Sequence, residues 1–173
     1  MTESAATFTN PGEDELIHVI RQYAQLTESV SPGTAGWRHP SQYHLLLEHG
    51  RRFTAMPSPP DLVGMPDRLC YSNAARYARA HRSEGLLYAE GLALTHEGLD
   101  FHLPHAWVVR SDGAVLDPTW NDAPGRAYIG VAVTDMDLWP YDGGGLLSDF
   151  ERALPLMRDG IPDGVLADVG RPL

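Results

Sequence analysis

Residues 103–120, LPHAWVVRSDGAVLDPTW, contain two apolar runs with the β-branched and aromatic content of strands, separated by turn residues. His105 opens the first run and Asp117 closes the second. If the runs pair as an antiparallel hairpin, the length of the turn decides whether these two polar side chains lie on one face of the sheet. The stretch therefore predicts a strand pair and a candidate His–Asp contact.

Two turn lengths are compatible with residues 111–113, Ser-Asp-Gly. A two-residue Asp-Gly turn sets Asp117 opposite position 108, which leaves His105 on the other face. A three-residue loop, with Gly113 in the left-handed region as a bulge, sets Asp117 opposite Trp107, so that His105 and Asp117 share a face. Because glycine stands third in the loop, we predict the three-residue form.

The sequence before the hairpin predicts helices. Asn10-Pro11 and the acidic residues after it begin a helix of about residues 11–28, and residues 41–50 form a short helix ended by Gly50. Residues 54–66 are rich in proline and are predicted to be irregular. Asp67 is predicted to cap a further helix running to about His81. Cys70 then falls in its first turn, where unpaired N–H groups and the helix dipole favour a thiolate.

The period of the apolar residues changes after that helix. Residues 86–94, 105–109, 114–117 and 127–133 are predicted strands, so three or four antiparallel strands follow the helices in an α+β order. A last helix is predicted at residues 146–157, followed by an irregular tail. We expect one domain over 1–173, with a helical part over 1–60, a core over 65–133, and a helix and tail over 134–173.

Composition limits the classes of function. The net charge of −10 and the 13 basic residues disfavour a nucleic-acid partner. Neither a signal peptide nor a membrane span is visible, so we expect a cytoplasmic protein without a membrane partner. The single cysteine excludes an internal disulfide and a thiolate metal cluster. His102 and His105 lie three apart on a predicted strand and face opposite sides, so no metal site is predicted.

A cysteine nucleophile needs an imidazole base, and the base needs a third group to orient it. The helix-start cysteine, the HAW tripeptide on a strand and the DPT that ends the next strand supply these groups in order along the chain. Over roughly residues 65–133 they resemble the transglutaminase-like branch of the papain-fold cysteine enzymes. The resemblance implies a papain-like fold, in which N-terminal helices and the nucleophile-bearing helix pack on a small antiparallel sheet. It also implies Cys70 as nucleophile, His105 as general base and acid, and Asp117 as the orienting carboxylate.

The function expected from this resemblance is cysteine-dependent acyl transfer on a peptide or small amide substrate, as hydrolysis of a peptidase or amidase type through a thioester, without a cofactor. Transglutaminase, deamidase and lasso-peptide leader-peptidase activities are alternatives within the family. An alternative of another class is a non-catalytic binding or interaction module of the same fold, which uses its acidic surface.

Other residues are candidates for the surroundings of this site. Trp107 and Trp120 flank it, as core packing or as walls of a substrate pocket. Asn73 and Tyr71 follow the cysteine on the helix and are further candidates for substrate binding. The backbone N–H of Cys70 is a natural oxyanion donor at a helix start. Gln42, Trp37 and Tyr71 are open candidates for a second donor. Glu90, on a predicted central strand, needs hydrogen-bond partners if it is buried.

Overall fold

In the part of the chain that the structure describes, six strands form one sheet in the order β4-β3-β2-β5-β1-β6, and all neighbouring strands run antiparallel. The computed structural model describes residues 10–173. The strands are β1 (Arg51–Phe53), β2 (Leu87–Leu94), β3 (His102–Val109), β4 (Val115–Leu116), β5 (Ala127–Val133) and β6 (Arg171–Pro172). The predicted α+β class and the four predicted strands, β2 to β5, are confirmed. β1 and β6 were not predicted, because three and two residues are too short to show a period of two.

The hairpin of β3 and β4 has the predicted register. Val108 pairs with Leu116 and Val109 with Val115, which sets Asp117 opposite Trp107. The turn is the three-residue loop, because the N–H of Gly113 bonds to the carbonyl of Arg110, and Gly113 has a φ of 83°. That left-handed φ is the reason why glycine stands at the third loop position.

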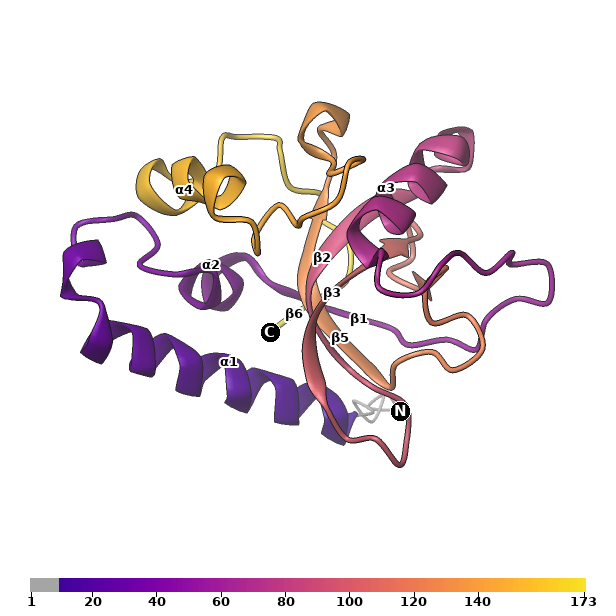
Figure 1. The fold of residues 1–173 in the computed structure, drawn as a ribbon, viewed down its shortest axis with the longest axis horizontal. Helices are drawn as coiled ribbons and strands as arrows, with labels where there is room; N and C mark the ends of the chain where they lie inside the picture. Colours follow the sequence, from indigo (N-terminus) through magenta and orange to yellow (C-terminus); the bar gives the residue numbers. More distant parts are fainter. Residues whose placement is uncertain (1–9) are drawn as a thin grey trace, which may run out of the picture.

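Within residues 10–173, four α-helices accompany the sheet: α1 (Pro11–Val30), α2 (Gln42–His49), α3 (Cys70–Ala80) and α4 (Phe150–Asp159). In Figure 1, α1, α2 and α4 lie to the left of the sheet and α3 crosses it at the upper right. The helices predicted at residues 11–28 and 41–50 are confirmed, and the Asn10 side chain accepts the N–H of Gly12 as the predicted cap. Within the described residues no helix has the length and apolar character needed to cross a membrane.

The start of α3 differs from the prediction. Asp67 does not cap the helix, which begins at Cys70 with no side-chain cap. Arg68 has a φ of 65°, so the chain is in the left-handed region just before the helix. Two hydrogen bonds hold this segment away from a helical path: the N–H of Met65 bonds to the carbonyl of Pro118, and the Asn73 side chain bonds to the carbonyl of Pro66. Cys70 is therefore the first helical residue, as its proposed chemistry needs.

The two faces of the sheet carry separate cores. The larger core lies under the helices and includes Ala74, Tyr88, Ala106, Val108 and Ile129. The smaller core lies on the other face and is covered by irregular segments. Its members are Phe53, Ala89, Ala93, Trp107, Val109, Val115, Tyr128 and Ala132. Alternation along each strand separates the two sets, so that neighbouring residues of β3 belong to different cores.

Two glycines allow the sheet to coil at its centre. Gly91 of β2 and Gly130 of β5 are directly paired. A Cβ atom on Gly91 would lie 2.1 Å from the carbonyl oxygen of Ile129, and one on Gly130 would lie 2.7 Å from the Trp107 ring. Backbone and side chains approach too closely here for any larger residue.

Candidate active site

His105 and Asp117 form a buried pair at the edge of the sheet. His105 Nε2 lies 2.8 Å from Asp117 Oδ2, and both side chains are almost fully excluded from solvent. The contact follows from the hairpin register, because residues 105 and 117 are diagonal neighbours on one face. With Nε2 engaged by Asp117, the ring presents Nδ1 as its other nitrogen to a second partner.

Asp117 is held by four hydrogen bonds. Its Oδ1 accepts the backbone N–H groups of Thr119 at 3.1 Å and Trp120 at 3.0 Å. Its Oδ2 accepts the Tyr128 hydroxyl at 3.0 Å in addition to His105. The Asp-Pro-Thr-Trp sequence thus folds back on its own aspartate, and β5 supplies the tyrosine. Four donors fix the carboxylate in one orientation as a hydrogen-bond acceptor.

The charge state of His105 is set by these partners. Burial lowers the pKa of His105, but the hydrogen bond and negative charge of Asp117 raise it, and Cys70 raises it further, to about 9. The ring is therefore mostly an imidazolium at neutral pH. A cation in this position stabilises a neighbouring thiolate.

Cys70 reaches this imidazolium from the first residue of α3. Cys70 is among the groups that raise the pKa of His105, so its thiol lies near the ring, and the residue is partly exposed to solvent. As the first helical residue, Cys70 also presents a backbone N–H that no preceding turn satisfies. The three side chains together form a thiol, an imidazole and a carboxylate in series, which is an arrangement suited to nucleophilic catalysis.

The two tryptophans have different positions. The Trp120 ring stacks on His105, with centroids 3.7 Å apart and planes 12° apart, and it is partly exposed. Trp107 is fully buried and packs on Phe53 and Tyr128 in the smaller core. The substrate-binding hypothesis for Trp107 is therefore wrong, because a fully buried ring cannot touch a substrate. Trp120 alone lies at the site.

Asn73 and Tyr71, the two residues predicted to bind substrate from α3, lie in different surroundings. The buried Asn73 amide donates to the Pro66 carbonyl at 2.7 Å and to the Thr119 hydroxyl at 3.0 Å, which ties the start of α3 to the loop after Asp117. Burial raises the pKa of Tyr71 to about 12, and the neighbouring Ser148 opposes this shift. The buried Asn73 therefore positions the site and does not bind substrate, whereas substrate binding by the partly exposed Tyr71 stays a prediction.

Comparisons with known proteins assign neither a family nor a function to this chain. No family model, curated protein or solved structure matches this chain. The candidate function therefore depends on the geometry of the chain's own residues.

Glu90 has a larger structural role than the sequence indicated. The fully buried carboxylate accepts the Tyr88 hydroxyl at 2.5 Å and the backbone N–H groups of Leu146, Leu147 and Ser148 at 2.6, 3.0 and 3.2 Å. Burial raises the pKa of this carboxyl, and the four hydrogen bonds oppose that shift. These bonds tie residues 146–148 to β2. Helix α4 starts at Phe150 and not at the predicted residue 146, because the Asp149 side chain caps it by accepting the N–H of Arg152. No sequence pattern indicates a contact between such distant segments.

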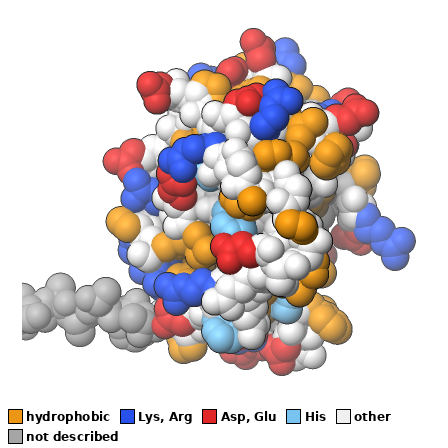
Figure 2. All heavy atoms as spheres, turned by 90° about the vertical axis from the view of Figure 1, so that its left-hand side faces the viewer, with side chains coloured by type: hydrophobic (Ala, Val, Ile, Leu, Met, Phe, Trp, Pro, Cys, Tyr) orange, Lys and Arg blue, Asp and Glu red, His pale blue; other side chains and the backbone are white. Residues whose placement is uncertain are grey.

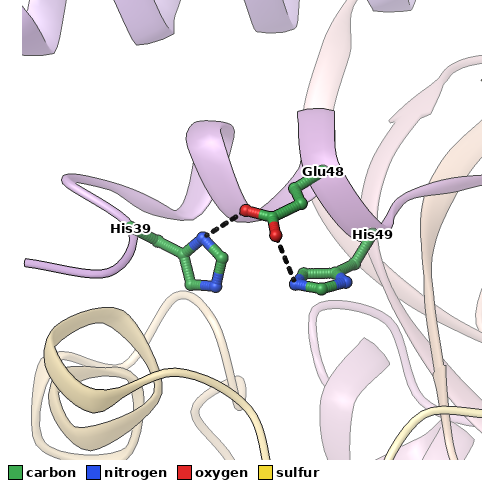
Figure 3. A group of neighbouring side chains, drawn as sticks. All are labelled: His39, Glu48 and His49. Atoms are coloured by element: carbon green, nitrogen blue, oxygen red, sulfur yellow. Dashed lines mark ion pairs between the residues drawn. The ribbon is translucent and has the colours of Figure 1, made fainter.

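A second cluster of polar side chains lies at the end of α2. His39, Glu48 and His49 bring their ligand atoms within 4.8 Å of one another, with Glu48 between the two rings (Figure 3). Glu48 lies 3.4 Å from His39 Nδ1 and 3.7 Å from His49 Nε2, and it also pairs with Arg38. Ligand atoms around a tetrahedral zinc stand roughly 3.3 Å apart, from Zn–N distances of roughly 2.0–2.1 Å. The cluster is more open than that, Glu48 already pairs with Arg38, and burial lowers the pKa of His39.

The surface charge is mixed on the side that carries α1, α2 and α4. Figure 2 shows arginine side chains interspersed with aspartate and glutamate over this face. The described residues make no continuous basic surface there, of the kind that contacts a phosphate backbone.

Proposed function

We propose that the protein is a cysteine hydrolase of the peptidase or amidase type, which cleaves an amide through a thioester on Cys70. The proposed fold is the transglutaminase-like variant of the papain fold. Support for it comes from the order of the elements: a helix that begins at Cys70, then a strand with His105, then a turn with Asp117. The observation that carries the functional proposal is the 2.8 Å contact between His105 and Asp117, with Cys70 near enough to raise the pKa of the same ring.

The steps follow from the charge states. The Cys70 thiolate attacks the amide carbon, and the backbone N–H of Cys70 faces the oxyanion that forms. The C–N bond then breaks, and the imidazolium of His105 gives its proton to the leaving amine. The neutral His105 next takes a proton from water as the water oxygen adds to the thioester. Loss of the C–S bond releases the acid and restores the thiolate and the imidazolium.

Asp117 contributes by keeping His105 in one orientation and by stabilising its positive charge. Trp120 covers one face of the imidazole and shields the ion pair from water, which strengthens its electrostatic interactions. Hydrolysis is the preferred outcome because water needs no second binding site.

The test uses p-nitrophenyl acetate, a small activated acyl donor that needs no knowledge of the natural substrate. With wild type we expect a stoichiometric burst of p-nitrophenol and a transient acetyl group on the protein in intact-mass spectra. Cys70→Ala should abolish both, and His105→Ala should slow acylation roughly 10²–10⁴-fold. Asp163→Asn, on an exposed residue, is the matched control.

Two results contradict the proposal. One is acetylation of Cys70→Ala at the wild-type rate, which would place the reactive group elsewhere. The other is a Cys70 that reacts slowly and equally in wild type and His105→Ala. That result favours the non-catalytic binding module, in which the cysteine is inert. The chain contains no lysine, so a product formed with an added amine would report acyl transfer without self-crosslinking at lysine side chains.

A further inference from the structure

A pocket of about 400 Å³ opens beside Trp120. Its walls come from three separate parts of the chain: the turn between β2 and β3, the segment after β4, and the residues before α3. We call it the Trp120 groove. The lining residues on which its chemistry depends are Asp67, Leu99, Phe101, Leu103, Trp120 and Asp122.

The groove carries unusual exposed apolar surface. Leu99, Phe101 and Leu103 are 49%, 60% and 42% exposed, and all three lie on one hairpin. None of them belongs to either hydrophobic core or to the partly buried residues packed against it. A contiguous apolar patch that the core does not use is a common property of ligand-binding surfaces.

The groove and the candidate active site share one residue, Trp120. Trp120, which forms part of its wall, stacks directly on His105. Leu103 is two residues before His105 on β3, so the two side chains point to the same side of the sheet. Trp120 therefore connects the imidazole of His105 to this apolar surface.

Two carboxylates lie among the lining residues. Among the described residues, neither Asp67 nor Asp122 forms an ion pair with an arginine or histidine. The whole chain carries a net charge of −10, so the surrounding potential favours a cation. An occupant that joins an apolar group to a positive charge complements both features of the groove.

We infer that the Trp120 groove binds an aliphatic or aromatic side chain of the amide substrate, and that Asp67 and Asp122 bind a cationic residue next to it. The inference rests on the proposed function. It assigns the substrate class as peptide segments in which a large apolar residue neighbours an arginine or lysine.

The test compares alkylating probes that all react at the single cysteine. The probes are iodoacetamide, N-phenethyl-iodoacetamide and a guanidinium-bearing analogue of the latter, and the readout is the second-order rate at Cys70 by intact-mass spectrometry. We expect the phenethyl probe to react about tenfold faster than iodoacetamide with wild type, since partial burial of an aromatic ring is worth about one factor of ten. The guanidinium should add a further preference that weakens at high salt.

Substitutions separate the groove from the reacting groups. Phe101→Ser combined with Leu103→Ser should bring the phenethyl-to-iodoacetamide ratio close to one. Asp67→Asn combined with Asp122→Asn should remove only the guanidinium preference. Phe150→Ser is the control, because Phe150 is also an exposed aromatic residue but lies at the start of α4, outside the groove, and it should leave all rates unchanged.

Two patterns overturn the inference by different routes. A wild-type ratio near one, or a ratio that the Phe101→Ser, Leu103→Ser variant does not change, rejects the groove while the His105 dependence of the iodoacetamide rate still supports the hydrolase. An iodoacetamide rate that is equal in wild type and His105→Ala rejects the proposed function, and the substrate assignment fails with it.

Discussion

Replacement of Asp117 by asparagine tests the charge state of His105 directly. The carboxylate now accepts four hydrogen bonds, two on each oxygen. In Asp117→Asn the single amide oxygen can keep the N–H groups of Thr119 and Trp120. The amide NH₂ then faces His105 and Tyr128 as a donor. To accept this hydrogen bond, His105 must have an unprotonated Nε2, so the proton of the neutral ring is on Nδ1.

The magnitude follows from the pKa of His105. Burial lowers that pKa, and the hydrogen bond and charge of Asp117 are the main effects that raise it to about 9. Without them, burial dominates and the pKa should fall below the ordinary 6.5 of histidine. A fall from about 9 to 6.5 corresponds to about 3 kcal/mol of lost stabilisation of the imidazolium.

The assay is iodoacetamide alkylation at pH 6.5, together with an NMR titration of the His105 ring. At this pH a thiol with the ordinary cysteine pKa of about 8.5 is only about 1% thiolate. A thiolate stabilised by an imidazolium should therefore alkylate up to about 100-fold faster than one without it. We expect Asp117→Asn to lose roughly 10- to 100-fold in rate, like His105→Ala, while Asp163→Asn keeps the wild-type rate. A wild-type rate in Asp117→Asn, with a His105 titration still near 9, would refute this account of the site.

Three further predictions concern stability, each measured by urea unfolding. Because the pKa of His105 is raised in the folded protein, its contribution to the free energy of unfolding is complete below about pH 6.5 and is lost as the pH rises through about 9. Wild type should therefore lose up to about 3 kcal/mol of stability over this range, whereas Asp117→Asn should not. Equal pH profiles of the two proteins contradict this. Glu90→Gln leaves backbone donors facing an amide NH₂ and should cost about 2–5 kcal/mol, whereas exposed Glu151→Gln should cost almost nothing. Gly91→Ala places a Cβ against the backbone of β5 and should cost about 1–3 kcal/mol or more, whereas Gly33→Ala, with open space around it, should be neutral.

Local sequence rules predict the hairpin well, because turn chemistry and the alternation along the strands act over a few residues. The position of glycine within residues 111–113 is enough to select the loop, and the loop is enough to set His105 and Asp117 on one face. The helix-start position of Cys70 was also predictable, although for a wrong reason. Helix α3 starts at Cys70 because Arg68 has a left-handed φ and because residues 65 and 66 form hydrogen bonds to Pro118 and Asn73. Asp67 does not cap the helix.

Contacts between distant segments were not predictable in the same way. Tyr128 of β5 donates a hydrogen bond to Asp117, and Glu90 of β2 accepts hydrogen bonds from residues 146–148. Each contact depends on how strands separated in sequence come together in the sheet, which no short-range pattern encodes. Trp107 and Trp120 show the same limit. Both looked alike in the sequence, yet the sheet buries one and leaves the other at the site.

The position of the candidate active site follows from where the sheet ends at its β4 edge. Ala106 and Val108 of β3 belong to the core beneath the helices, whereas His105 and Trp107 point to the opposite face. The thiol of α3 and the imidazole therefore start from opposite sides of the sheet, and they can meet only around its edge. Pro118 stands opposite Ala106, at a position of β4 where the ladder requires a backbone N–H that proline lacks. β4 accordingly stops at Leu116, the chain turns at Asp117, and the first residue of α3 reaches past this edge to His105.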